Sequence, residues 1–265
     1  MADRSRKRKI ETDKDSSEAK VANDSPVIAA FQQFQEELDL RHDKYERIVK
    51  SSRDLTIQSK RAIFNLHRIA GADNSEKIIH EVGRKLHEIK QYLKKIALEL
   101  EGEDPFRFSR AYSPGLQEYI ESLSFYYYLK NKTLVPFQEV VENCTFPAED
   151  GKALKLEVPL PDYVLGIADL TGELMRFCMN STANGDGDTP FTVCQFMREV
   201  HDELALLEYC CKDIGRKLGA LKSSLYKVEH VCYTLQVRRS EFPQLNVADL
   251  LKCGSGMENI KMHDQ

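Results

Sequence analysis

Two pairs of carboxylates stand out in this sequence, because each pair lies at helical spacing inside a largely apolar stretch. Asp169 and Glu173 are four residues apart, and Glu118 and Glu121 are three apart. Side chains at these spacings share one face of a helix and can converge on one point. Burying a carboxylate is costly unless it is paired with a cation, protonated or bound to a metal. Each pair therefore needs a compensating partner.

The stretch from Tyr163 to Asn180 predicts a helix that is apolar on nearly every side. Its one polar stripe contains Asp169, Glu173 and Arg176, and it ends at Asn180. A helix of this kind is normally buried. One interpretation of the stripe is an internal ion pair between Glu173 and Arg176; the other is a metal site that uses both carboxylate pairs. The stripe alone leaves both open.

The stretch from residue 115 to residue 129 predicts another helix, with a continuous apolar face and with Glu118 and Glu121 on the opposite side. A polar helix face is usually solvated. Here, however, Phe125, Tyr128 and Leu129 occupy the same side one to two turns further along. This pattern predicts that the carboxylate face lines a cavity or an interface.

Four carboxylates without His or Cys favour Mg²⁺, with Mn²⁺ as the alternative, over zinc. Such an ion can activate a water and neutralise charge that develops on a phosphodiester. The sequence contains no G-x-S-x-G motif, no P-loop, no Rossmann glycine pattern and no cysteine with a local catalytic signature. From spacing alone, metal-dependent phosphodiester hydrolysis stays open beside the simpler interpretation, a helical scaffold protein.

The composition is that of a helix-rich globular protein, with 265 residues of which 42% are hydrophobic and 30% charged. The net charge is -4, and residues 1–20 contribute +2, which leaves -6 for the remainder. The folded part therefore lacks the overall basic character of a typical nucleic-acid binder and would need a local basic patch. Seven cysteines without a C-x-x-C pair indicate a reducing, intracellular compartment. No apolar run reaches the length of a membrane span, so we expect no membrane association.

Residues 1–24 are polar and charged, and we expect them to be disordered. A short basic cluster within them allows two interpretations, a nuclear-localisation signal or a solubilising tail. The cluster consists of Arg4, Arg6, Lys7, Arg8 and Lys9.

The periodicity predicts an all-α fold of six or seven helices, with a long N-terminal helix from about residue 26 to residue 69. Further helices are expected at about 74–101, through 115–129, within 131–161, from 163, at 190–210 and at 213–237, with a short final segment near 247–251. We expect one domain over residues 25–253 and a flexible tail at 254–265. The long first helix carries a basic face that is mostly solvated, and Arg53, Lys60 and Arg61 form its candidate phosphate-binding subset.

Four longer motifs resemble the translin-associated factor X group of the translin family: residues 34–47, 115–121, 162–176 and 184–191. The resemblance extends over roughly residues 25–245. It implies an all-α translin fold and a closed, octamer-like hetero-oligomer with translin. It also implies a Mg²⁺-dependent endoribonuclease for single-stranded RNA, with single-stranded DNA as a second ligand class, in both the cytoplasm and the nucleus. The associated roles are removal of passenger-strand fragments with the RNA-induced silencing machinery, and of tRNA precursor fragments.

The family's catalytic carboxylates fall on Glu118, Glu121, Asp169 and Glu173, all of which are intact here. In the mechanism that this implies, the four side chains hold Mg²⁺ and one of them, with Glu121 as the candidate, acts as general base. Two other functions stay open. One is a non-catalytic scaffold that stabilises translin and its nucleic-acid binding, and the other is a DNA-binding adaptor that acts through the basic tail.

Overall fold

The structure is a computed structural model that describes residues 26–72, 74–147, 151, 153–210 and 212–241. The chain divides into two compact units, residues 1–45 and residues 46–265. The described part of the first unit is the N-terminal section of helix α1 (Pro26–His67), on which Phe31, Phe34 and Leu38 are exposed. The predicted basic signal, the predicted segment near 247–251 and the predicted C-terminal tail lie outside the described residues.

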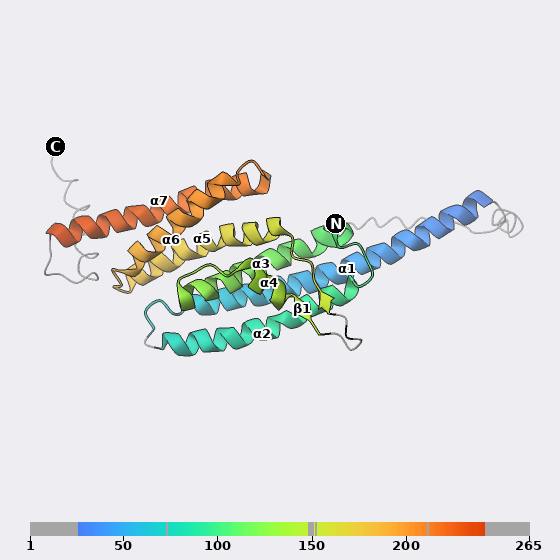
Figure 1. Cartoon of the computed structure of the whole chain (residues 1–265), viewed down its shortest axis with the longest axis horizontal. Coiled ribbons are helices and arrows are strands. Elements are labelled where there is room, and N and C mark those ends of the chain that lie inside the picture. The colour runs from blue at the N-terminus through green and yellow to red at the C-terminus, as the bar shows by residue number, and fades with distance from the viewer. Residues whose placement is uncertain (1–25, 73, 148–150, 152, 211, 242–265) are drawn as a thin grey trace, which may run out of the picture. The chain divides into compact units, whose positions relative to one another are not determined.

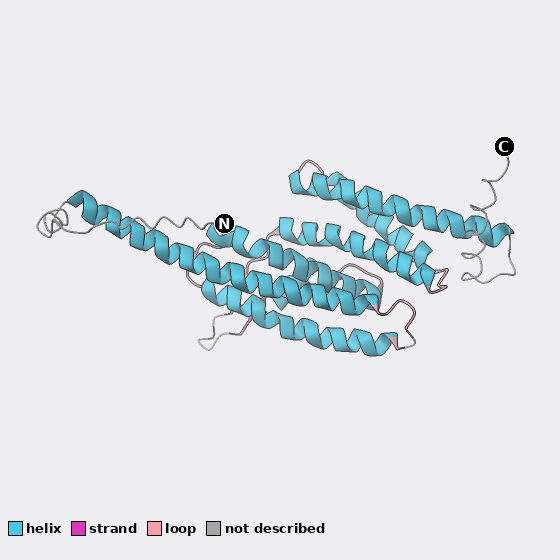
Figure 2. Ribbon diagram, turned by 180° about the vertical axis from the view of Figure 1, so that it is seen from behind, coloured by secondary structure: helices cyan, strands magenta, loops and turns pink. Residues whose placement is uncertain are grey.

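The prediction of an all-α fold with a long first helix is confirmed (Figures 1 and 2). The described ranges contain seven helices, and none of them is both long and apolar enough to cross a membrane. After α1 they are α2 (Ser75–Glu99), α3 (Pro105–Asn131), α4 (Phe137–Asn143), α5 (Leu160–Ala183), α6 (Thr189–Leu206) and α7 (Lys212–Glu241).

The sequence did not predict one feature, a small two-stranded sheet between α4 and α5. Strands β1 (Thr145–Phe146) and β2 (Leu154–Lys155) pair antiparallel, with Phe146 opposite Leu154. Each strand has only two residues, which is too short for a period-2 pattern to show in the sequence.

The second unit is a helical bundle in which α3 and α5 lie at the centre. Helix α3 packs against α2 and α5, and α5 packs against α6 and α7 (Figure 1). The side chains of Tyr112, Tyr119, Phe125 and Tyr128 on α3 are all less than 2% exposed. Phe125 and Tyr128 lie on the same side of α3 as the carboxylates, so this side is covered by other chain segments at their level.

Two glycines bring α3 close to its neighbours at the level of the carboxylates. A Cβ atom on Gly115 would lie 2.6 Å from the Ser52 carbonyl oxygen on α1, and the Gly115 N–H donates to Ser52 Oγ at 3.2 Å. A Cβ atom on Gly166 of α5 would lie 2.7 Å from Ile120 Cγ2 and 3.0 Å from the Gln117 carbonyl oxygen. The α1–α3 and α3–α5 crossings can be this close because Gly115 and Gly166 have no side chains.

Substituting Gly166 with Ala is expected to destabilise the fold by about 1–2 kcal/mol. Overpacking a tight crossing costs roughly 1–3 kcal/mol, and the gain in helix propensity from Gly to Ala, at most about 1 kcal/mol, offsets only part of it. Gly172 on the same helix provides a matched control, because no atom lies within 4 Å of the Cβ that it would carry. Gly172→Ala should leave denaturant unfolding unchanged or make the protein slightly more stable. Equal effects of the two substitutions would contradict the close α3–α5 contact.

Candidate active site

The structure brings the four predicted carboxylates together. Helix α3 supplies Glu118 and Glu121, and helix α5 supplies Asp169 and Glu173. The negative charges of Glu118, Asp169 and Glu173 all act on Glu121 and raise its pKa. We refer to these four side chains as the carboxylate cluster.

Glu121 is the buried member of the carboxylate cluster. It is 9% exposed, and it makes no hydrogen bond or ion pair with any residue that the structure describes. Burial, and after it the charges of Glu118, Asp169 and Glu173, raise the pKa of Glu121 to about 8, while Lys60 opposes the rise. At neutral pH and without a bound cation, this carboxyl group is therefore protonated in most molecules.

Two lysines from other helices donate to the cluster. Lys60 on α1 pairs with Glu118, with 2.9 Å between Lys60 Nζ and Glu118 Oε1. This hydrogen bond, with the charges of Glu118, Glu121 and Glu173, raises the pKa of Lys60. Lys217 on α7 donates to Asp169 Oδ1. Both ammonium groups therefore stand where a phosphate bound at the cluster would meet positive charge.

Glu173 takes its hydrogen bond from a histidine on α1. His67 Nε2–H donates to Glu173 Oε2, and this bond is the main reason why the pKa of Glu173 is lowered. Arg176 lies further away, 3.9 Å from Glu173, and its side chain is 56% exposed. The ion pair that the α5 stripe suggested is thus only a secondary contact, and the main partners of the stripe, His67 and Lys217, come from other helices.

The His67 ring is held in one orientation. It is 8% exposed and packs against Phe125 of α3, with 5.0 Å between ring centroids. Because Glu173 accepts a hydrogen bond from Nε2, that nitrogen carries the hydrogen. The other nitrogen, Nδ1, is buried without a hydrogen-bond partner among the described residues. The contact with Phe125 therefore aims a fixed N–H donor at one oxygen of Glu173.

Replacing His67 with Leu is expected to lower the free energy of unfolding by about 1.5–3 kcal/mol at pH 7, the usual range for a hydrogen bond to a charged group. His67→Gln retains an N–H donor at similar reach and should lose less than half as much. The bond lowers the pKa of Glu173, so its contribution to the free energy of unfolding is fully present at pH values above the usual glutamate pKa. This contribution is lost as the pH falls through the pKa of Glu173 in the folded state. Urea unfolding at pH 7 and pH 3.5 measures this. Equal losses for Leu and Gln would contradict a donor role for His67.

The sequence interpretation missed His67 and Lys217. His67 and Lys60 are seven residues apart, two helical turns, so they share a face of α1. That spacing was the only available signal, and it does not say which helix the face meets. Lys217 lies 48 positions beyond Asp169, and no local pattern links them.

The three predicted nucleic-acid-binding residues of α1 have different surroundings. Lys60 contacts the carboxylate cluster, and Arg61 lines a groove between α1 and α2. Arg53 is exposed on the Lys60 face of α1, two turns away, and it lines neither the groove nor the cluster. The structure therefore places one of the three residues, Lys60, at the cluster.

The donor set of the cluster fits a hard divalent cation. Four carboxylates supply only oxygen ligands, the preference of Mg²⁺ and Mn²⁺, and Glu121 is buried without a partner of its own. Within the described ranges, no group of three or more His, Cys, Asp or Glu side chains already has the spacing of a metal site. Lysine or histidine donors engage the other three carboxylates, Glu118, Asp169 and Glu173.

Comparison with known proteins gives a consistent family assignment. Residues 43–239 match the Translin family. The chain is 47% identical to Translin-associated protein X of Mus musculus, over 88% of this chain and 86% of that protein, and 26% identical to Translin of Homo sapiens, over 80% and 89%. Among solved structures it resembles apo-NeC3PO, with a TM-score of 0.62, 22% identity and coverage of 77% and 96%. It also resembles AfC3PO in complex with duplex RNA, with a TM-score of 0.61, 17% identity and coverage of 79% and 98%. The chain therefore belongs to the Translin family.

Proposed function

We propose that this chain is the catalytic subunit of a translin-containing endoribonuclease that hydrolyses single-stranded RNA with Mg²⁺. The observation that carries the proposal is the carboxylate cluster, in which α3 and α5 hold four acidic groups together around the buried, unpaired Glu121. Clustering like charges in a protein interior is destabilising, so an arrangement of this kind is typical of a site that binds cations.

Glu118, Glu121, Asp169 and Glu173 would hold the metal. When bound, Mg²⁺ supplies an activated water and neutralises charge on the phosphodiester. Side chains of this protein would orient the ligands and shield them from solvent. His67 fixes the orientation of Glu173, and the burial of Glu121 keeps one carboxyl group away from bulk water.

Lys60 and Lys217 have the chemistry to bind the RNA phosphate. Their ammonium groups already lie at the carboxylates of Glu118 and Asp169, and both side chains are more than a third exposed. With those carboxylates engaged as metal ligands, Lys60 and Lys217 would be free to donate to a phosphate oxygen. The lysines therefore link the metal-binding and substrate-binding parts of the proposed site.

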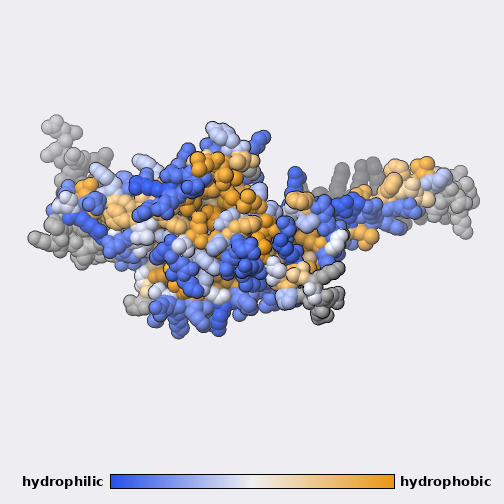
Figure 3. Space-filling model, in the orientation of Figure 1, coloured by the Kyte–Doolittle hydropathy of each residue, from blue (hydrophilic) through white to orange (hydrophobic). Residues whose placement is uncertain are grey.

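A hetero-oligomer with translin is part of the proposal, and an apolar surface supports it. A groove of about 340 Å³ is lined mainly by residues of α5 and α6, and Leu206 in its lining is 76% exposed. Apolar side chains gather over this region of the second unit, in the upper middle of Figure 3. Exposed apolar patches of this kind mark protein interfaces. A partner subunit would also contribute basic surface, which suits a chain with a net charge of -4.

The experiment that tests this function is cleavage of a labelled single-stranded RNA by the chain co-expressed with translin. We expect cleavage in Mg²⁺ or Mn²⁺ and none in EDTA, with internal cuts that produce short fragments. Passenger-strand and tRNA-precursor fragments are the substrates that we propose in the cell. Cleavage that persists in EDTA, or an assembled complex that binds RNA in Mg²⁺ without cutting it, would contradict the proposal.

One observation favours a second candidate function, a non-catalytic scaffold for translin. Glu118, Asp169 and Glu173 each already accept a hydrogen bond or ion pair from a side chain of the same subunit. A buried network of this kind can serve folding specificity without any metal. The scaffold predicts that neutralising the cluster leaves RNA binding unchanged and that the complex does not depend on this chain for cutting.

A further inference from the structure

A groove between α1 and α2 shares one residue, Lys60, with the surroundings of the carboxylate cluster. It encloses about 710 Å³, within the roughly 300–1,000 Å³ of ligand sites. Lys60 lines the groove and also donates to Glu118, so one side chain joins the groove to the cluster. Seven of its eleven lining residues carry charged or amide side chains. The charged and amide side chains are Gln58, Lys60, Arg61, Asn65, Lys85, Glu88 and Gln91.

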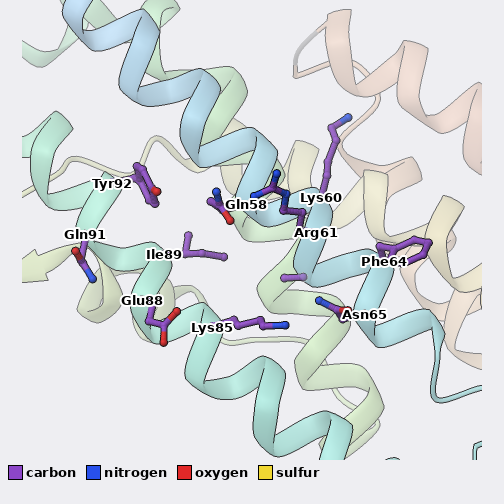
Figure 4. A pocket seen from close by; sticks show the side chains of 11 residues that line it. Gln58, Lys60, Arg61, Phe64, Asn65, Lys85, Glu88, Ile89, Gln91 and Tyr92 are labelled. Carbon is purple, nitrogen blue, oxygen red and sulfur yellow. The ribbon is translucent and has the colours of Figure 1, made fainter.

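Basic side chains outnumber carboxylates in the lining of the groove. Its lining carries three basic side chains and one carboxylate. Arg61 is exposed and forms no ion pair with the described residues, while Lys85 pairs with Glu81 one turn away on its own helix. Figure 4 shows Arg61 next to Gln58 on α1, and Lys85 reaching from α2 toward Asn65. A local basic patch of this kind attracts a polyanion.

Aromatic rings lie at both ends of the groove. Tyr92 is half-buried on α2, and Phe64 on α1 is 63% exposed. Phe64 is one turn beyond Lys60, and in Figure 4 both side chains point to the same side, away from Tyr92. Nucleic-acid bases stack on exposed aromatic rings regardless of their sequence, while basic groups follow the backbone. The groove therefore offers both kinds of contact.

We infer that this groove binds the nucleotides that flank the scissile phosphate of a single-stranded RNA. Arg61 and Lys85 bind backbone phosphates, and bases stack on Tyr92 and Phe64. The inference rests on the proposed function and extends it from the cleaved phosphate to the neighbouring strand. The lining argues against a protein partner, because the centres of protein interfaces are depleted of charged residues.

The first test measures binding without cleavage. The full chain co-expressed with translin is titrated in EDTA against a fluorescein-labelled oligouridylate of about 12 nucleotides, a length that such strand-binding grooves accommodate. Arg61→Gln combined with Lys85→Gln should raise Kd on the order of tenfold, and should lower the slope of log K against log salt by about 1.4 for two lost phosphate contacts. The matched control, Lys77→Gln with Lys94→Gln, removes the same charge from exposed positions of α2 outside the groove and should leave Kd and slope near wild type.

The second test separates the groove from the cluster. Tyr92→Leu removes a stacking surface and should raise KM for the 12-nucleotide RNA about tenfold with kcat unchanged. A trinucleotide that spans only the carboxylate cluster should be cut at the wild-type rate. Tyr233→Leu, on an exposed tyrosine of α7, serves as the matched control.

Either of two results would overturn the inference. Groove variants that bind and cut the long RNA like wild type would show that the strand leaves the cluster by another route, although cleavage itself would still support the proposed function. Groove variants that no longer co-purify with translin would assign this surface to assembly. A complex that binds RNA through the groove but never cuts it would instead refute the proposed function alone.

Discussion

Replacing Glu121 with Gln and Asp169 with Asn in one chain is expected to lower the rate of RNA cleavage by about 10³-fold or more. The two amides nearly preserve side-chain size but replace one carboxyl group on α3 and one on α5, so a cation would lose ligands on both helices. A metal contributes several kcal/mol to phosphodiester cleavage, and each 1.36 kcal/mol corresponds to tenfold in rate. Single-turnover cleavage by the complex with translin measures the loss directly, because it excludes product release.

The control for this experiment must show that the variant still folds and assembles. Size-exclusion chromatography with translin and RNA binding in EDTA should match wild type. A variant with Glu76→Gln and Asp202→Asn makes the same two substitutions at exposed positions on α2 and α6, and it should cut normally. If the cluster variant cuts as fast as wild type, the four carboxylates form a structural network and the scaffold function is favoured.

Glu121→Gln alone is expected to make the metal-free protein more stable at alkaline pH, by up to about 4–5 kcal/mol at pH 8.5. The pKa of Glu121 is about 8 in the folded state against 4.5 for an unperturbed glutamate. The folded state therefore keeps a proton that the unfolded chain releases, and the wild type loses stability as pH rises from about 4.5 to 8. A pKa that differs by 1 between the folded and unfolded states corresponds to about 1.4 kcal/mol. Gln has no proton to lose, so the variant should not show this decline.

Denaturant unfolding in EDTA at pH 4.5, 6.5 and 8.5, at one protein concentration, checks the prediction. The two proteins should be about equally stable at pH 4.5 and should diverge as pH rises. Mg²⁺ should reverse the order by stabilising wild type more than the variant, because only the folded cluster binds the cation. A difference between the proteins that is constant across pH would contradict the raised pKa of Glu121.

Local periodicity was sufficient to predict the helices and the two carboxylate pairs. The apolar sides of α5 and the aromatic residues beside Glu121 on α3 indicated burial, and the structure confirms it for Phe125 and Tyr128. The helical spacing of the pairs fixed which carboxylates share a face, because that depends only on 3.6 residues per turn. The two-residue strands β1 and β2 were missed because they are too short to show a period.

The partners of the carboxylates could not be derived in the same way. The sequence offered Arg176 for Glu173, because it is the neighbour one turn away, yet His67 makes the main contact from 106 positions away. The contact between Lys217 and Asp169 and the α1–α2 groove likewise arise from the packing of helices that are distant in the sequence. Two helices pack where the side chains of one fill the spaces between the side chains of the other. A single sequence does not indicate which helices match in this way, except where small residues such as Gly115 and Gly166 allow a close approach.

The sequence by itself determined the helical fold and which acidic side chains share a helix face, since both follow from local spacing. The meeting of the two pairs, the burial of Glu121 without a partner, and the positions of His67, Lys60 and Lys217 around them depend on how the helices pack. The physical reason is that burial and electrostatic coupling arise between elements far apart in the chain. In this protein those long-range contacts turn four ordinary carboxylates into a candidate active site.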